Sequence, residues 1–186
     1  TILHYDGNSW SPMDPGTPLS ISLYDVWGSG PNDVYAVGHG EITADLVMHY
    51  NGTAWSIVDT PATATTRKIW GSGASDIFAA GDSSQVVHYN GSDWSLMDLG
   101  DAPGWLFAVG GSSSSNVLVL GMCGKMYRYN GSSWSALHSG TTNEFNDVWG
   151  SSGNNVFAVG WDGTIYHYDG SFWSQMASGT TVWLKG

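Results

Sequence analysis

The chain has 186 residues, of which 16 are acidic and 5 are basic, and its net charge is −11. A field of that sign repels phosphate backbones, which argues against nucleic acid and anionic membranes as partners. The apolar runs are short and interrupted by Gly, so no membrane insertion is expected, and the lone Cys123 excludes an internal disulfide. The Ser/Thr/Gly/Asn/Trp-rich, Lys-poor composition is typical of exported proteins, and we expect a secreted or cell-surface bacterial protein.

One ten-residue pattern recurs along the chain. It reads HYDGNSWSPM from residue 4, HYNGTAWSIV from 49, HYNGSDWSLM from 88, RYNGSSWSAL from 128 and HYDGSFWSQM from 167, in steps of 45, 39, 40 and 39 residues. A second pattern, DVWGSGPNDVYAVG at residue 25, returns in altered form at 68, 108 and 147. A period near 40 residues indicates a stacked or radial array of repeats.

The content of one period predicts four short antiparallel strands. In the first full repeat the apolar runs are YDVWG, DVYAVG, LVMHYNG and AWSIV, separated by polar turns. The second run is apolar at consecutive positions in each repeat, as expected for a strand covered on both faces; these positions are 34–37, 77–80, 117–120 and 156–159. We therefore predict an all-β fold, a β-propeller with four-stranded antiparallel blades.

The ends of the sequence predict how the ring closes. Full repeats span about 18–57, 58–97, 98–136 and 137–176 of a single domain, 1–186. Residues 1–17 match the third and fourth strands of a repeat, and residues 177–186 match the first, with Gly186 equated to Gly150. We expect five blades, the last shared by both ends. Because residues 151–163 have no counterpart there, that blade is three-stranded, or belongs to a longer chain, or is filled by a second chain in an oligomer.

The repeated aromatic residues are predicted to be wedges between neighbouring blades. The Asn-Gly and Asp-Gly pairs between them predict tight hairpin turns in which both residues take positive φ angles. The Tyr slot holds Tyr5, Tyr50, Tyr89, Tyr129 and Tyr168, and the Trp slot holds Trp10, Trp55, Trp94, Trp134 and Trp173.

The motifs WGSGPNDVYAVG and HYDGxSW resemble the tandem propeller repeats of large secreted or lipid-anchored bacterial proteins. The YDGxxW hairpin is also similar to the end of a kelch repeat. The resemblance covers nearly the whole chain and implies a propeller fold. It implies no catalytic residues.

Other recurring polar residues have plain structural interpretations. The His slot (His4, His49, His88 and His167, with Arg128 as the fifth member) is repeated around the ring, so we expect partly exposed side chains and no shared metal ion. Three sequons follow from the hairpin pattern, at Asn51, Asn90 and Asn130. The turns SGPND and SSGNN are interpreted as capped turns in preference to Ca²⁺ sites.

No catalytic motif is present, so we expect no enzyme activity and no cofactor. Four loop carboxylates could in principle form a glycosidase pair, but isolated loop acids are usually solvated; they are Glu41, Asp82, Glu144 and Asp162. Cys123 has no evident base beside it.

The repeats differ most in two loops, between strands two and three and between strands four and one. In a four-stranded meander both emerge on the same face, and loops on a rigid scaffold carry most function. The residues that depart from the repeat there are Glu41, Arg67, Lys68, Trp105, Glu144, Trp161 and Asp162.

Two binding functions remain open. The first is a lectin similar in spirit to the five-bladed tachylectins, in which sugars stack on Trp and bond to the polar turn residues; these are Asp6, Asn51, Asn90, Asn130 and Asp169. The second is a protein-interaction or structural module of a larger bacterial surface protein, with one site on the irregular loops. A glycan or a protein is the expected ligand.

Overall fold

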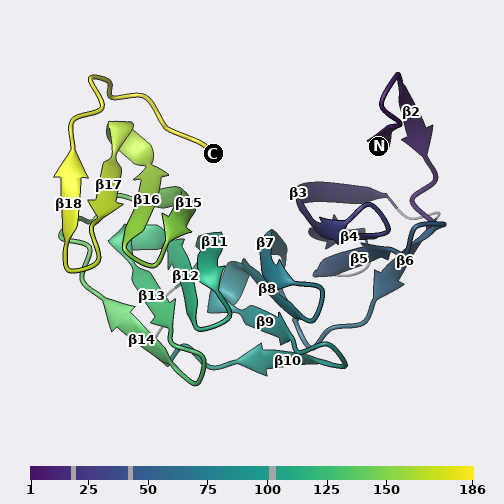
Figure 1. Cartoon of the computed structure of the whole chain (residues 1–186), viewed down its shortest axis with the longest axis horizontal. Helices are drawn as coiled ribbons and strands as arrows, with labels where there is room; N and C mark the ends of the chain where they lie inside the picture. Colours follow the sequence, from purple (N-terminus) through teal and green to yellow (C-terminus); the bar gives the residue numbers. More distant parts are fainter. Residues whose placement is uncertain (18–19, 42–43, 101–103) are drawn as a thin grey trace.

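The chain folds as an open arc of antiparallel sheets, seen in a computed structural model that describes residues 1–17, 20–41, 44–100 and 104–186 (Figure 1). Four sheets have four strands each, and a fifth sheet has two. In the described part of the chain the helices are three single 3₁₀ turns, and none is long and apolar enough to cross a membrane. The predicted all-β propeller class is confirmed.

Each four-stranded sheet is one blade, and its strands pair in chain order. The two-stranded sheet is the N-terminal hairpin, β1 (Ile2–Tyr5) and β2 (Trp10–Met13). Blade 1 has β3 (Ile21–Gly30), β4 (Asp33–Gly40), β5 (Leu46–Tyr50) and β6 (Trp55–Val58). Blade 2 has β7 (Thr66–Gly73), β8 (Asp76–Gly81), η1 (Asp82–Ser84), β9 (Val86–Tyr89) and β10 (Trp94–Met97). Blade 3 has β11 (Leu106–Ser113), β12 (Asn116–Gly121), η2 (Met122–Gly124), β13 (Met126–Tyr129) and β14 (Trp134–Leu137). Blade 4 has β15 (Phe145–Ser152), β16 (Asn155–Gly160), η3 (Trp161–Gly163), β17 (Ile165–Tyr168) and β18 (Trp173–Met176).

The first strands of successive blades line the inside of the arc, and the fourth strands form its rim (Figure 1). Strand β7 contacts β3, and β11 contacts both β7 and β15. The second strand of each blade lies behind the first, and β8 and β12 are covered on both faces by neighbouring blades. All six residues of β12 are buried, as are five of the six residues of β8, which is why these strands are apolar at consecutive positions.

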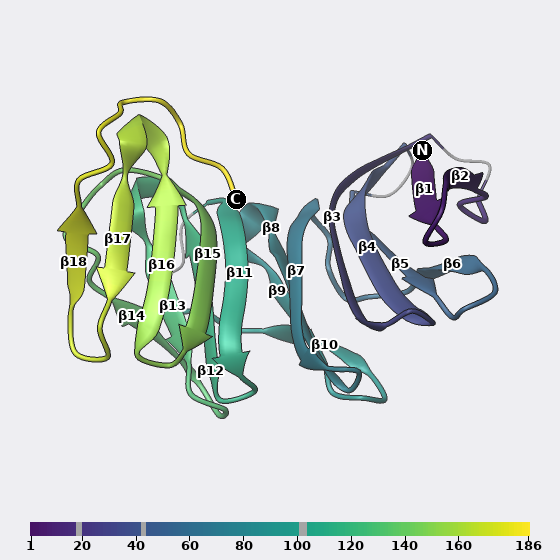
Figure 2. The same ribbon diagram turned by 45° about the horizontal axis from the view of Figure 1, so that its top comes forward.

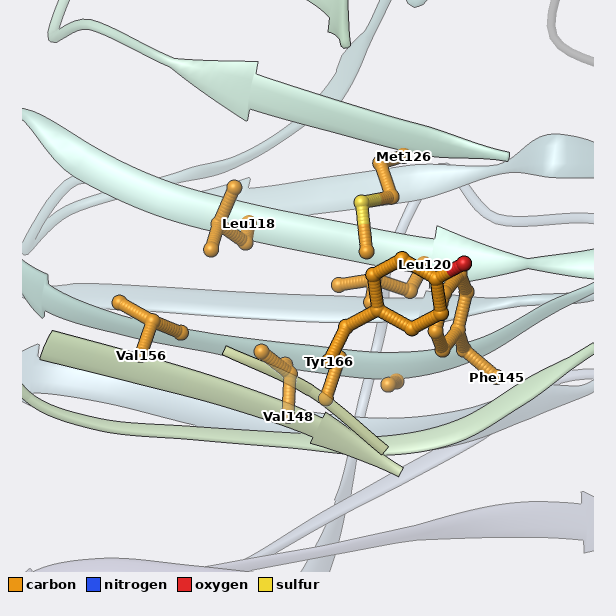
Figure 3. Packing of buried hydrophobic residues seen from close by; sticks show 9 residues of the cluster. Leu118, Leu120, Met126, Phe145, Val148, Val156 and Tyr166 are labelled. Atoms are coloured by element: carbon orange, nitrogen blue, oxygen red, sulfur yellow. The ribbon is translucent and has the colours of Figure 1, made fainter. Parts of the chain in front are cut away.

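The core consists of the junctions between blades. Figure 3 shows the junction of blades 3 and 4, where Leu118, Leu120 and Met126 meet Phe145 and Tyr166. The other junctions repeat this arrangement, with a Trp of one blade packing against the second strand of the blade before it. The ring of Trp134 stands edge-on to Phe78 of blade 2, 6.3 Å away between centroids, and Trp94 stands edge-on to Tyr35 of blade 1 at 6.2 Å.

The hairpin turns differ from the predicted type. Tyr50 pairs with Trp55, so the loop has four residues, and of the Asn-Gly pair only Gly52 has a positive φ, 91°. The carboxamide of Asn51 instead accepts hydrogen bonds from the N–H groups of Thr53 and Ala54, at 3.0 and 3.1 Å. These two bonds hold the turn without a left-handed Asn, together with the backbone hydrogen bond of 3.3 Å from the N–H of Asn51 to the carbonyl of Ala54.

The two ends of the chain do not share a blade in this structure. The hairpin β1–β2 forms its own sheet at one end of the arc, and residues 177–186 contain no strand. Figure 1 shows the two ends apart, and Figure 2 shows the C-terminal segment running from β18 over blade 4 to the inner strands. The physical reason lies in the missing second strand, because without it nothing can pair a first strand with a third.

The register of the C-terminal segment also differs from the predicted one. A Cβ atom on Gly163 would lie 2.0 Å from the carbonyl oxygen of Thr180, as a Cβ on Gly124 would from that of Thr141. Thr180 therefore occupies the repeat position of Thr141. Gly186 then corresponds to Asp147, against which it packs, and not to Gly150.

Candidate functional site

One position of the repeat brings different side chains together at the inside of the arc. In each blade, a Cβ atom on one Gly of the second strand would meet a carbonyl oxygen at or just before the start of the first strand, at 1.9–2.2 Å. The pairs are Gly38 with Ser22, Gly81 with Thr65, Gly121 with Trp105 and Gly160 with Glu144, and they fix the alignment of the blades. Two residues after that carbonyl stand Tyr24, Arg67, Phe107 and Asn146. By the register of Thr180, Lys185 holds the same position in the C-terminal segment.

Four of these side chains converge because they come from the innermost strands, and Lys185 joins them from the C-terminal segment. Tyr24, Arg67, Phe107, Asn146 and Lys185 line one pocket of about 260 Å³ together with Lys68 and Gly186, and we call it the axial pocket. Equivalent positions lie far apart at the rim of a propeller, but near the axis they meet. The repeat therefore supplies a scaffold, and one variable slot supplies the chemistry of a shared site.

Arg67 lies at the centre of an aromatic group. Its Cζ atom is 5.4 Å from the ring centroid of Trp105, 5.7 Å from that of Tyr24 and 5.9 Å from that of Phe107. Its Nε and Nη2 atoms donate to the two carboxylate oxygens of Asp82, at 2.5 and 3.0 Å. This hydrogen bonding raises the pKa of Arg67, partly offset by burial, so the guanidinium is a permanent cation in a rigid orientation.

Lys68 and two acids, Asp147 and Asp25, lie beside the aromatic group. The Nζ atom of Lys68 in blade 2 lies 3.7 Å from Asp147 in blade 4, which shows how closely the first strands approach at the axis. Asp25 accepts a hydrogen bond of 3.0 Å from the N–H of Ile69. Burial raises the pKa of Asp25, against the opposing effects of that hydrogen bond and of Lys68.

The axial pocket concentrates positive charge in a strongly acidic protein. Three of the chain's five Lys and Arg residues line it, while the net charge of the chain is −11. Arg67 and Lys68 have carboxylate partners, whereas Lys185 is exposed and has no ion-pair partner among the described residues. The pocket can therefore receive a carboxylate next to the apolar rings of Tyr24 and Phe107.

The structure brings some of the predicted loop residues together and leaves others apart. Arg67, Lys68 and Trp105 form or border the axial pocket. The two kinds of variable loop do meet on one face, where the N–H of Ser84 in η1 donates to Gly104 before β11 at 2.6 Å. The predicted loops that include residues 42–43 and 101–103, and the predicted boundary at residue 18, lie partly outside the described residues.

Four predicted residues do not line the pocket. Trp161 stacks on Trp183 with centroids 4.2 Å apart, and its backbone N–H donates to the carbonyl of Glu144 at 3.0 Å. Asp162 is exposed in η3 with a φ of 53°. The N–H of Glu41 donates to Ser20 at 3.0 Å, beside the end of β4.

The polar turn residues proposed as sugar ligands are engaged in their own turns. One side-chain oxygen of each accepts the N–H groups two and three positions later, at distances of 2.8–3.1 Å; the residues are Asp6, Asn51, Asn90, Asn130 and Asp169. These bonds lower the pKa of Asp6, through Ser9 first and then Asn8, and that of Asp169, through Phe172 first and then Ser171.

The recurring Tyr and Trp side chains point into the junctions, except at the N-terminal hairpin. Those of the four complete blades are buried or half-buried, the slots being Tyr50, Tyr89, Tyr129 and Tyr168, and Trp55, Trp94, Trp134 and Trp173. Tyr5 and Trp10 are 48% and 67% exposed, contrary to the wedge prediction, because no blade formed by the described residues lies in front of the hairpin.

The His slot has a structural role in three blades. The Nε2 atom of His49 lies 2.7 Å from Asp33, that of His88 lies 2.7 Å from Asp76, and that of His167 lies 2.8 Å from Asn155. Each ring stacks on an aromatic ring of the second strand, at 4.3–4.5 Å between centroids. Within the described ranges, no three His, Cys, Asp or Glu side chains are placed to hold a metal ion.

Sequence reasoning missed Tyr24, Phe107, Asn146 and Lys185. The signal was present in the aligned first strands, which read YDVWG, RKIWG, FAVGG and NDVWG and differ most at their first residue. Equivalent positions of a propeller lie far apart at the rim, so variation there indicates separate sites. Near the axis they meet, so variation at one slot of the first strand indicates a single shared site.

Comparison with known proteins places the chain among β-propellers by its fold. No family model matches the sequence, and neither does any curated protein. Among solved structures, it is similar to "YCF48 bound to D1 peptide", with a TM-score of 0.61 and 16% identity over 91% of this chain and 56% of that one. It is also similar to YCF48 from Cyanidioschyzon merolae, with a TM-score of 0.61 and 18% identity over 87% of this chain and 58% of that one. The chain thus spans a little over half the length of these propellers.

Proposed function

We propose that this chain is a protein-interaction propeller that holds a peptide segment in the axial pocket. The observation that carries the proposal is the convergence of one variable slot, filled by Tyr24, Arg67, Phe107, Asn146 and Lys185, at one place on a scaffold that otherwise repeats itself. A repeat that keeps its packing residues and diversifies the one position able to form a shared site has the pattern of a binding surface. The similarity to a YCF48 propeller bound to a peptide gives fold-level support.

The chemistry of the pocket selects the kind of peptide. Lys185 is an exposed cation, and Arg67 is held by Asp82 so that its remaining Nη1 atom faces no acceptor among the described residues. The rings of Tyr24 and Phe107 supply apolar walls. A peptide that presents a carboxylate beside an apolar side chain satisfies both features.

The carbohydrate-binding hypothesis has less support from the geometry. Its polar turn oxygens already accept backbone hydrogen bonds, and the repeated Trp rings of the complete blades face the junctions. Two hollows at equivalent places in blades 2 and 4, one bordered by Ser83 and Leu96 and the other by Asp162 and Gln175, have no aromatic lining residue on which a sugar could stack. A hollow between blades 3 and 4 does have aromatic lining residues, namely Tyr168, Phe172 and Trp173.

The test is selection of ligands from two libraries in parallel. The chain is screened against a displayed library of random peptides and against a glycan array. Selected ligands are then titrated into Arg67→Ala, Lys185→Ala and a control, Lys125→Ala, which removes the same charge from an exposed position directly after η2. Loss of a charge-assisted hydrogen bond should weaken peptide binding about 10- to 100-fold in the first two variants and less than about 2-fold in the control.

Two outcomes would reject the proposal. One is the selection of acidic peptides whose affinity is the same in all three variants. The other is binding of glycans alone, at several equivalent sites per chain, which would restore the lectin hypothesis.

A further inference from the structure

Every blade in the arc has two different faces. The leading face turns toward the preceding blade and carries the repeated Tyr and Trp, while the trailing face turns toward the next blade. At the junction of blades 2 and 3, Tyr127 and Trp134 of the leading face pack against Phe78 and Val86 of the trailing face. The junctions on either side use the same repeat positions, so any leading face is built to fit any trailing face.

The N-terminal hairpin presents a leading face that none of the described residues covers. Leu3 and Trp10 are 55% and 67% exposed. The residues at the same repeat positions in blade 1, Met48 and Trp55, are 0% and 6% exposed because the hairpin covers them. Large apolar side chains in contiguous exposure mark an interaction surface.

Blade 4 presents the complementary trailing face. Trp149 is 64% and Met176 is 44% exposed, and Phe157 is half-buried. The residues that correspond to Phe157 in the other blades are 0–5% exposed, namely Tyr35, Phe78 and Leu118. Trp27 and Trp70, which correspond to Trp149, lie against a Gly of the following blade.

We propose that the uncovered leading face of the hairpin docks on the uncovered trailing face of blade 4 in a second copy of this chain. The two faces lie at opposite ends of the arc (Figure 1). The occupant is identified by the three complete junctions inside the chain, each of which joins these same two surfaces. This proposal does not require a ligand in the axial pocket, although Tyr24 and the C-terminal segment with Lys185 take part in both sites.

Each copy has a pocket in front of blade 1 that can hold the first strand of the shared blade. In front of β3 there is an apolar pocket of about 290 Å³ lined by Leu3, Leu23, Val26, Ala36 and Trp55. Val26 is 63% exposed there, whereas its equivalents Ile69, Val109 and Val148 are 4–7% exposed. The C-terminal segment of the other copy follows the register of a first strand. It can therefore supply the inner part of a blade whose outer part is the hairpin.

The contact is heterologous, because each copy uses a different face. Such contacts do not saturate in a dimer, and they add further copies unless the assembly closes into a ring. The net charge of −11 on each copy opposes the approach, so added salt should strengthen the association through screening.

The test is the association state of the chain and of two face variants. Sedimentation velocity at about 1 to 200 µM protein in about 0.3 M NaCl should show the wild type growing beyond a dimer with concentration. Trp10→Asp blocks the leading face and Trp149→Asp blocks the trailing face; each should weaken self-association by about 30-fold or more. Both side chains are exposed, so the folded state should tolerate the changes, and circular dichroism verifies this.

The mixture of the two variants gives the decisive reading. One free face remains on each, so an equimolar mixture should form a one-to-one dimer and nothing larger. Phe172→Asp, which alters the most exposed aromatic side chain, at a hairpin tip on neither face, is the control and should associate like the wild type. A wild type that stays monomeric, a mixture that fails to form the dimer, or a loss of association in Phe172→Asp would each overturn the proposal.

Discussion

Trp55 and Trp10 occupy the same repeat position in opposite environments, and comparing their Ala variants measures what a blade junction contributes. Trp55 is 6% exposed between the hairpin and blade 1, and Trp10 is 67% exposed. A Trp side chain can bury about 200 Å², so the two differ by about 120 Å² of buried surface. At about 25 cal/mol/Å² this corresponds to about 3 kcal/mol.

We expect Trp55→Ala to lower the free energy of unfolding by about 3–5 kcal/mol and Trp10→Ala by about 1 kcal/mol. Guanidinium unfolding followed by far-UV circular dichroism, at about 1 µM protein so that self-association is negligible, gives both values. Equal losses in the two variants, or a difference below about 1 kcal/mol, would show that junction packing is not what stabilises the arc.

Three further variants probe the turns and the axis. Gly124→Ala should cost about 2 kcal/mol more than Gly140→Ala in thermal or denaturant unfolding. Both residues have a positive φ (67° and 78°), but only at Gly124 would the new Cβ lie 2.0 Å from a backbone oxygen, that of Thr141. Equal costs would contradict the close approach of Gly124 to the backbone of Thr141. Asn90→Ala removes the acceptor of the Ser92 and Asp93 N–H groups and should cost about 1 kcal/mol, with a normal result for Asn90→Asp as the check on that explanation. Asp25→Asn should raise the free energy of unfolding at neutral pH. Burial raises the pKa of Asp25 in the folded state, so the charged carboxylate destabilises the fold at a pH above that pKa. This destabilisation disappears as the pH falls through the raised pKa toward the ordinary value. The gain in the Asn variant should therefore shrink toward pH 3, and a gain that is constant with pH would refute the cause assigned to the shift.

The fold could be predicted from the sequence because its determinants are local and repeated. Consecutive apolar residues such as those at 117–120 define the covered second strand, and the Tyr and Trp around each hairpin define the junction. The hairpin turn was placed correctly but assigned the wrong geometry, since the preference of Asn for left-handed backbone competes with its ability to cap, and here the cap is formed.

The candidate site was only partly predictable, because it depends on the curvature of the arc. Arg67 and Trp105 stood out by departing from the repeat, but their contact joins two blades and no local pattern indicates it. Tyr24, Asn146 and Lys185 look like ordinary residues of a first strand until the first strands are placed around one axis. The prediction of a closing blade shared by both ends is wrong for a related reason. Residues 1–17 and 177–186 each match part of a repeat, and only the three-dimensional path of the chain shows that they lie at opposite ends of the arc.

The most direct test of the proposed function is to map a selected peptide onto the chain by NMR. The ring centroid of Trp105 lies 5.4 Å from the Cζ atom of Arg67. The indole N–H signal of Trp105 should therefore shift on titration, together with the backbone signals of Phe107 and Asn146. The indole N–H of Trp134, which lies at the rim and contacts Met97, should stay in place. Shifts confined to the rim hairpins, with the Trp105 and Asn146 signals unmoved at saturation, would contradict binding in the axial pocket.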